Sequence, residues 1–387
     1  MPILALATIA LTRAFAFDPS ADWNSVSSAI RMRYYGRVQQ KDRMEKLLTD
    51  YAPKAKAATT LPQFEDVVNS MIKDFGDSHF GLFTRSDQGY YTMDGLVKGF
   101  GGGEGLPMPT FGAWIKTTPD GYAVQMVVDG TSAQHADIRK GDVILKVNDQ
   151  PFTPVDSLAS LVGKTAQLQV KRGSQTLTKS VEIKEQNPIS TFLDGSNDSA
   201  RVISAGGKKY GYFHLWTMGN QRFQTALSNA VYGKLSSTDA FILDIRDGFG
   251  GRPEGYADPF FRPEVFLEWG QGGGVSRQMF GYGRPLIVLI NKGSRSAKEV
   301  LAYILKKSKR AVLIGSNTAG DVLGTSPVKL GDWGYIEIPM VDVKADGQRL
   351  EKVGVAPDIA VPAEFDADGK DLYISEAIKY LEAHPGR

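Results

Sequence analysis

One stretch, Pro285 to Leu305, constrains the fold of this 387-residue chain more than any other. Mostly branched apolar residues run from Pro285 to Ile290, which is typical of a strand buried in a parallel sheet. Asn291 to Gly293 predict a turn, and a helical pattern runs from Ser294 to Lys306. Ser296 is therefore predicted where a buried strand gives way to a helix, and free N–H groups there can stabilise a developing negative charge.

A second interpretation of Ser296 needs no chemistry. Ser296 and Glu299 form an S-x-x-E pattern, which is a capping box that satisfies the first N–H groups of a helix. Both interpretations stay open until other motifs are considered.

Composition excludes several function classes. The 45 basic and 43 acidic residues give a net charge of +2, so no strong field attracts nucleic acid or anionic membrane. The absence of cysteine excludes disulfides, thiol catalysis and thiolate metal sites. Because no zinc, calcium or phosphate-loop motif occurs either, the sequence predicts no metal and no cofactor.

The first 16 residues have features of an export signal. Pro2 to Leu11 is a short apolar run, and Ala14-Phe15-Ala16 offers a small-x-small cleavage pattern, although a basic start is missing. Export predicts a periplasmic or secreted protein; the alternative is a buried N-terminal element. No other segment reaches the length of a membrane span.

Residues 17–96 are expected to form a helical N-terminal segment. Leu61 to Phe75 carries apolar residues at helical spacing, and Gly76 can end that helix. The turn that follows, Asp77 to Leu82, contains His79. Taken by itself, His79 would be a turn histidine that makes only local hydrogen bonds, and a functional interpretation depends on the motifs described below. Val97 to Gly105 is glycine-rich and predicts a loop or hinge.

Residues 97–185 predict a compact β-rich domain. Gly130 to Ala133 and Asp137 to Asp142 resemble the signature of PDZ domains, which bind extended peptide ends by adding a strand to a sheet edge. The resemblance implies that the loop which binds the peptide carboxylate contains Phe111, Gly112, Ala113 and Trp114, although this segment departs from the usual G-L-G-F.

Residues 186–199 have the composition of a linker, and residues 200–387 alternate strands with helices. This alternation predicts an α/β domain with parallel strands, including Lys209 to Leu215, Ala240 to Ile245, Ala311 to Gly315 and Gly334 to Met340. Active sites of such sheets gather at the carboxyl ends of the strands. Gly250 and Ser296 both follow such ends.

Four motifs in this domain resemble those of the carboxyl-terminal processing (tail-specific) peptidases. They are Leu243-Asp244-Ile245-Arg246 with Gly250-Gly251, Gly293 to Glu299, Gly315 to Gly320, and Gly354 to Ile359. Gly248 stands where the first motif usually has asparagine. The resemblance implies an α/β catalytic domain similar to the crotonase and Clp-protease folds, after a helical N-terminal segment and a PDZ-like domain. We expect Asp244 and Arg246 to form an ion pair that shapes the turn, and His214 to be packed or to line a cleft.

One departure bears on the catalytic base. The main branch of this family pairs its serine with a lysine after the T-x-G turn, and that position is Asp321 here. The tricorn-like branch uses a histidine before its PDZ domain and a late acidic residue, which His79 and Glu351 match. The resemblance thus implies a serine peptidase with Ser296 as nucleophile, His79 as base and Glu351 orienting the histidine. The oxyanion hole would consist of Ala297 with Gly250 or Gly251.

We therefore expect a serine endopeptidase that cleaves proteins or peptides with accessible carboxyl-terminal tails. Two alternatives remain. A catalytically inactive family member could bind a ligand or peptide, as the related retinoid-binding proteins of the eye do, or the chain could be a scaffold whose PDZ-like domain recruits partners.

Overall fold

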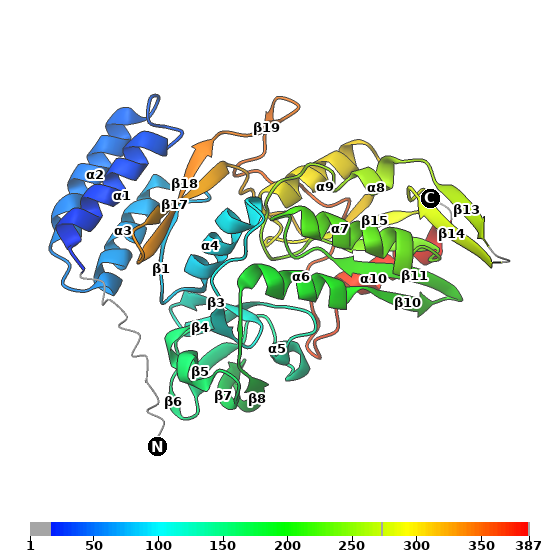
Figure 1. Ribbon diagram of the computed structural model, residues 1–387, viewed down its shortest axis with the longest axis horizontal. Coiled ribbons are helices and arrows are strands. Elements are labelled where there is room, and N and C mark those ends of the chain that lie inside the picture. The colour runs from blue at the N-terminus through cyan, green and yellow to red at the C-terminus, as the bar shows by residue number, and fades with distance from the viewer. Residues whose placement is uncertain (1–16, 272–273, 386–387) are drawn as a thin grey trace, which may run out of the picture.

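The computed structural model describes residues 17–271 and 274–385, and Figure 1 shows its arrangement. The predicted export signal, residues 1–16, lies outside the described residues. Within them, no helix has the length and apolar character needed to cross a membrane.

Three N-terminal helices pack on a small antiparallel sheet made from both halves of the chain (Figure 1). The helices are α1 (Pro19–Arg33), α2 (Lys41–Lys56) and α3 (Leu61–Phe75), and the strands are β1 (Gly81–Thr84), β17 (Gly324–Leu330) and β18 (Gly334–Val341). α3 has the predicted bounds, and Gly76 ends it at φ +68°. β1 pairs with β18, with Gly81 opposite Glu337. The strand predicted at Gly334 to Met340 is therefore correct in position but belongs to this sheet and not to the α/β sheet.

Helix α4 (Gln88–Phe100) leads from β1 into a five-strand antiparallel path that forms the β-rich domain. Its order is β3 (Ala113–Thr118), β4 (Gly121–Val127), β5 (Val143–Val147), β7 (Thr165–Arg172) and β8 (Gln175–Glu182), and β6 (Gln150–Pro151) pairs with β5. The short helix α5 (Ser132–His135) and a 3₁₀ helix (Asp156–Leu161) cover its core, while β2 (Met108–Thr110) pairs with β9 (Lys184–Gln186). A compact β-rich domain therefore lies in this part of the chain, as the sequence predicts. α4 extends into the glycine-rich segment predicted as a loop, so the loop itself begins only after Phe100.

The predicted linker, residues 186–199, is wrong as a description of structure. Helix α6 (Pro188–Ser199) fills most of it and begins at the Asn187 N-cap, whose side chain accepts the Ser190 N–H. Phe192 and Ile189 are buried in the main core, and Trp114 lies 4.3 Å from Phe192 between ring centroids. Because the segment is rich in polar residues, its composition does not indicate a helix. The apolar face of this helix nevertheless packs between the two domains.

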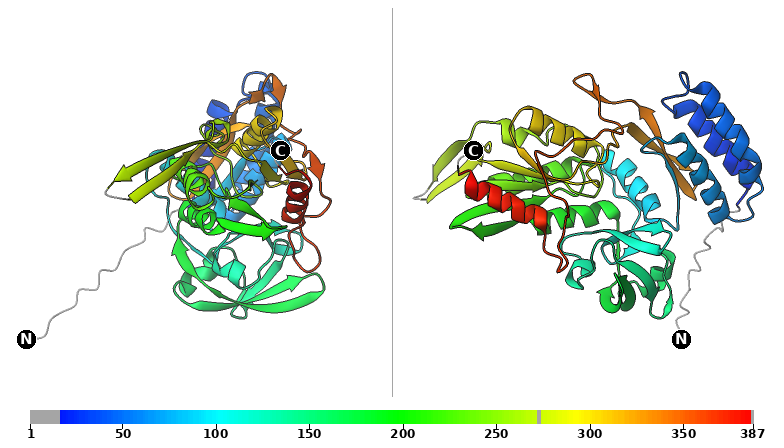
Figure 2. Two further views of the ribbon diagram at one scale, coloured as in Figure 1. Left: turned by 90° about the vertical axis from the view of Figure 1, so that its right-hand side faces the viewer. Right: turned by 180° about the vertical axis from the view of Figure 1, so that it is seen from behind.

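The C-terminal domain is a mostly parallel sheet covered by helices on both faces. Its order is β10 (Arg201–Ala205), β11 (Lys208–His214), β12 (Ala240–Asp244), β15 (Leu286–Ile290), β16 (Val312–Gly315) and β21 (Ile359–Ala360), with only β10 antiparallel to its neighbour. One face is covered by α6, α7 (Gln221–Asn229, continued by a π turn at Ala230–Lys234) and α9 (Ala297–Lys307), and the other by α10 (Leu372–Ala383), as Figure 2 shows. Helix α8 (Asp258–Phe261) and the hairpins β13 (Val265–Gln271)–β14 (Gly274–Phe280) and β19 (Lys344–Ala345)–β20 (Gln348–Arg349) complete the domain.

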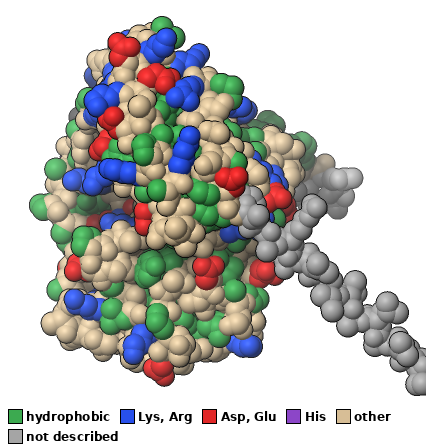
Figure 3. Space-filling view, turned by 90° about the vertical axis from the view of Figure 1, so that its left-hand side faces the viewer, with side chains coloured by type: hydrophobic (Ala, Val, Ile, Leu, Met, Phe, Trp, Pro, Cys, Tyr) green, Lys and Arg blue, Asp and Glu red, His purple; other side chains and the backbone are tan. Residues whose placement is uncertain are grey.

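Charges of both signs are mixed on one face of the molecule (Figure 3). In the space-filling view of Figure 3, lysine and arginine side chains are interspersed with aspartate and glutamate on the face that it shows. This distribution agrees with the near-zero net charge of the chain.

Candidate active site

Ser296 lies at the carboxyl end of β15, where it is the N-cap residue of α9. Its backbone has φ +59° and ψ −128°, a region that non-glycine residues rarely occupy and that is found mainly at functional sites. The Glu299 side chain accepts the Ser296 N–H at 3.1 Å, so the capping-box pairing predicted from S-x-x-E is also present. The same residue therefore caps the helix and occupies a strained position.

Glu299 joins the serine motif to the T-x-G turn. Its carboxylate accepts the Thr318 hydroxyl at 2.6 Å, the Gly320 N–H at 2.7 Å and the Asp321 N–H at 2.9 Å. Burial raises the pKa of Glu299, and the hydrogen bonds, which lower the pKa, offset this effect only in part. Because the Asp321 carbonyl accepts the Ser296 N–H at 2.8 Å in turn, two of the sequence motifs meet at the serine.

Gly250 faces Ser296 across the ends of β12 and β15. A Cβ atom at position 250 would lie 2.8 Å from Ser296 Oγ and 2.9 Å from the Ala297 nitrogen. The Gly250 carbonyl is held by the Met218 N–H at 2.8 Å and the Thr217 hydroxyl at 2.9 Å. The first N–H groups of a helix have no acceptor within it, so the Ala297 N–H is available beside the serine.

Gly251 adopts a conformation that requires glycine. Its φ is +136°, and a Cβ atom there would lie 2.0 Å from the Met218 carbonyl oxygen. Gly250 and Gly251 thus form a tight turn over the start of α9, as the predicted oxyanion hole requires.

His79 lies in the turn between α3 and β1 and is 7% exposed. Its Nδ1 lies 3.1 Å from Ser78 Oγ, and the Ser78 hydroxyl donates to Glu351 Oε2 at 2.9 Å. Since that single hydroxyl proton goes to the carboxylate, Ser78 Oγ accepts from Nδ1–H, which leaves Nε2 as the unprotonated nitrogen. This is the tautomer that a general base needs.

Glu351 is buried and reaches His79 only through Ser78. Its Oε2 also accepts the Val322 N–H at 2.8 Å and the Leu323 N–H at 3.2 Å. A direct contact between Glu351 and His79, as the resemblance implies, is therefore replaced by a relay through Ser78. Sequence reasoning missed Ser78, and its position next to His79 was the available signal.

Burial and the charge of Arg295 lower the pKa of His79 well below its usual value. Arg295 directly precedes Ser296 in the sequence. Among the residues that the structure describes, however, His79 and Ser296 share no hydrogen bond. Catalytic hydrogen bonds are often long before substrate binds.

Lys298 is a second residue that sequence reasoning missed. It is fully buried, and its Nζ donates to the Asp247 carbonyl at 2.6 Å. A Cβ atom at Gly248 would lie 3.1 Å from Nζ, so the ammonium occupies space beside the position where the motif usually has asparagine. Burial lowers the pKa of Lys298 to about 7. Lys298 belongs to the helix that begins at Ser296, and its hydrogen bond holds the turn that leads to Gly250.

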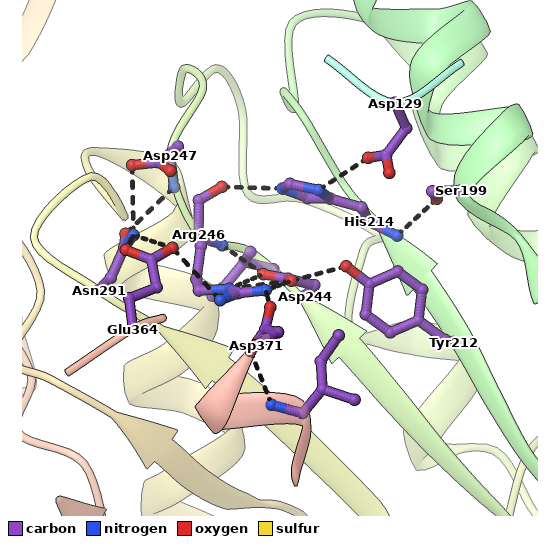
Figure 4. Close-up of polar contacts among 12 residues, drawn as sticks. Asp129, Ser199, Tyr212, His214, Asp244, Arg246, Asp247, Asn291, Glu364 and Asp371 are labelled. Atoms are coloured by element: carbon purple, nitrogen blue, oxygen red, sulfur yellow. Dashed lines mark hydrogen bonds and ion pairs between the residues drawn. The ribbon is translucent and has the colours of Figure 1, made fainter. Parts of the chain in front are cut away.

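The expected ion pair of Asp244 and Arg246 is present and buried. Arg246 Nη2 lies 2.5 Å from Asp244 and 2.6 Å from Asp371, and the Tyr212 hydroxyl donates to Asp244 at 2.8 Å. These side chains converge at the end of β12 (Figure 4). The pair anchors the end of β12 beneath the glycine turn.

His214 is packed, as predicted, and joins the two domains. Its Nε2–H donates to the Arg246 carbonyl at 3.0 Å, and its Nδ1 faces Asp129 of the PDZ-like domain at 3.1 Å (Figure 4). Burial opposes the charged form, but the charges of Asp244 and Asp129 outweigh it and raise the pKa of His214. Because both nitrogens already have partners, His214 is no candidate base.

The loop that is predicted to bind a peptide carboxylate is buried. Phe111, Gly112, Ala113 and Trp114 are all buried. The Gly112 N–H donates to Thr110 Oγ1 at 3.0 Å, and the Gly112 carbonyl accepts from Val128. Peptide binding by these residues stays a prediction.

Comparison with known proteins supports the motifs. Residues 209–361 match the model of peptidase family S41, and residues 109–183 match that of the PDZ domain. Carboxyl-terminal-processing peptidase 2, chloroplastic, of Arabidopsis thaliana is 30% identical over 299 residues, which are 71% of this chain and 55% of the relative. The chain thus spans about half the length of that relative.

Solved structures show the same fold. A photosystem II D1 C-terminal processing protease aligns over 92% of this chain and 96% of its own with a TM-score of 0.53 and 22% identity. The tricorn protease aligns over 94% of this chain and 36% of its own with a TM-score of 0.56 and 18% identity. The chain thus contains a peptidase family S41 domain, which residues 209–361 match, with a PDZ domain ahead of it.

Proposed function

We propose that the protein is a serine endopeptidase of the tricorn-like branch, with Ser296, His79 and Glu351 in a triad that includes Ser78 as a relay. The carrying observation is the close approach of the Gly250 backbone to Ser296 and the Ala297 nitrogen, where even a Cβ atom at position 250 would collide. A helix cap alone does not require a glycine backbone against its first residue.

In the proposed reaction Ser296 Oγ attacks the carbonyl carbon of a peptide bond while His79 Nε2 takes the hydroxyl proton. The negative oxygen of the tetrahedral intermediate accepts hydrogen bonds from Ala297 and from Gly250 or Gly251. The intermediate then expels the amine, which receives the proton from His79. A water molecule attacks the acyl-enzyme by the same route and restores the free serine.

The proposed substrates are proteins or peptides with accessible carboxyl-terminal tails. Support comes from the PDZ domain beside the catalytic domain and from the names of the relatives, which describe carboxyl-terminal processing. Periplasmic or secreted location is proposed from residues 1–16, and cell fractionation with N-terminal sequencing of the mature protein tests it.

Replacement of the nucleophile tests the activity. Ser296→Ala should abolish hydrolysis of an unfolded protein substrate and labelling by a fluorophosphonate probe, without a change in melting temperature beyond a few degrees. Ser308→Ala, at the other end of α9, is the matched control and should retain both. Unchanged turnover by Ser296→Ala would reject the proposal.

The alternative is an inactive binding protein, favoured by Asp321 at the lysine position and by the missing hydrogen bond between His79 and Ser296. Absence of labelling at Ser296 in the folded wild-type protein, together with retained peptide binding, would support it.

A further inference from the structure

Strand β3 of the PDZ domain has an edge along which a side chain from another part of the fold lies. β3 is the end strand of the order β3-β4-β5-β7-β8, so one of its edges has no neighbouring strand among the described residues. Gln88 Nε2 donates to the Ala113 carbonyl at 3.0 Å, and Gln88 Oε1 accepts the Ile115 N–H at 2.8 Å. These two backbone groups are those that an added strand would use first.

The Gln88 amide imitates one residue of such a strand. Groups at positions i and i+2 of a strand point to the same edge. In a parallel ladder, one residue of the neighbouring strand donates its N–H to the carbonyl of residue i and accepts the N–H of residue i+2. A primary amide presents the same donor and acceptor side by side. Gln88 therefore satisfies Ala113 and Ile115 without a second strand.

The fold holds this amide in place. Gln88 is the first residue of α4 and is 5% exposed. Tyr90 and Met93 of the same helix pack against Tyr335 of β18, and the Tyr335 hydroxyl donates to Asp94 at 2.8 Å. The position of Gln88 is thus fixed from outside the PDZ domain, and the side chain does not reach the edge by chance.

We propose that Gln88 competes with the substrate tail for the edge of β3, so that a tail pairs with Ala113 and Ile115 only after this amide has left. The identity of the ligand rests on the proposed function. Each hydrogen bond that the tail makes here replaces one that Gln88 already makes, so pairing at these two residues contributes little net affinity. The affinity that remains comes from side-chain contacts of the tail.

Binding to the full-length Ser296→Ala protein tests the competition independently of catalysis. The probe is a fluorescein-labelled decapeptide library that is randomised at its last four residues and ends in a free carboxylate. Gln88→Leu should bind it about tenfold more tightly by anisotropy than the Gln88 protein, as expected for two released hydrogen bonds. Gln175→Leu, an exposed glutamine on β8, is the matched control and should bind as the parent does.

Hydrogen exchange at one amide provides a second measurement. The Ile115 N–H should exchange slowly in the Gln88 protein, faster in Gln88→Leu, and slowly again when the library is added to that variant. If Gln88→Leu does not fold, Gln88→Glu takes its place in both measurements, because it puts a carboxylate oxygen against the Ala113 carbonyl. The same results are then expected for Gln88→Glu. Equal or weaker binding by the variants, or no binding by any of the proteins, would overturn the proposal. Normal binding without hydrolysis in the wild type would instead reject only the proposed function.

Discussion

Gly250 and Ser296 are so close that no side chain fits between them: a Cβ atom at position 250 would lie 2.4 Å from Ser296 Cβ. The two residues follow different strands of the sheet, β12 and β15. Their proximity makes the glycine at this position a requirement for access to the serine.

The first prediction concerns this glycine. Gly250→Ala should lower kcat by roughly 100-fold or more, because the methyl group would collide with Ser296 and displace the serine and the donors of the proposed oxyanion hole. Steady-state kinetics on a peptide substrate would measure it. Gly233→Ala is the control, since a Cβ atom there has no atom within 4 Å. Full activity in Gly250→Ala would show that the reaction does not depend on this close approach.

The second prediction concerns the relay. Ser78→Ala removes the acceptor of His79 Nδ1–H and separates Glu351 from the imidazole. We expect kcat to fall by roughly 100-fold with KM nearly unchanged, because the tautomer of the base is no longer fixed. Ser70→Ala, an exposed serine on α3, should be neutral. If Ser78→Ala loses no activity, the relay has no catalytic role.

The third prediction is a pH dependence. Burial and the charge of Arg295 lower the pKa of His79, so the proposed base stays unprotonated at pH values below those at which histidine usually gains a proton. The acidic limb of kcat/KM against pH should therefore lie below pH 6.5 in the wild type and move to higher pH in Arg295→Gln. A limb at the same pH in both proteins would contradict the assignment of His79 as base.

The fourth prediction concerns stability. Folding lowers the pKa of Lys298 from 10.5 to about 7, so between these values the unfolded chain binds more protons than the folded one. The free energy of unfolding of the wild type should rise with pH across this window, and that of Lys298→Met should lack this rise. The free energy of unfolding of Lys298→Met minus that of the wild type should then fall by a few kcal/mol from pH 7 to pH 10.5, as measured by urea titrations. Lys379→Met, at an exposed lysine, should follow the wild type at every pH.

Local sequence patterns predicted most of the elements because their signals are local. The bounds of α3 and the strand before Ser296 agree with hydrophobic periodicity and turn residues. α6 was missed because its apolar residues are separated by serine, aspartate and glycine, and only packing on neighbouring helices makes this segment helical.

The site was predictable in its parts and less so in its connections. Motif order predicts Ser296, Gly250 and the candidate base, and the structure brings Gly250 against Ser296. The contacts of Ser78 and Lys298 could not be predicted, because they involve residues far away in the sequence. Gln88 carried no signal at all, since a glutamine at a helix start is ordinary and its function arises from an edge strand that only the fold brings to it.

The pairing of β1 with β18 sets the order in which the candidate site can be assembled. Gly81 is two residues after His79, yet its partner Glu337 follows the PDZ domain and most of the α/β sheet in the sequence. On a ribosome, the segment that carries the histidine must wait for β18 before this pairing can form. A nascent chain of this protein is therefore expected to be unable to digest itself or its neighbours until β18 has left the ribosome.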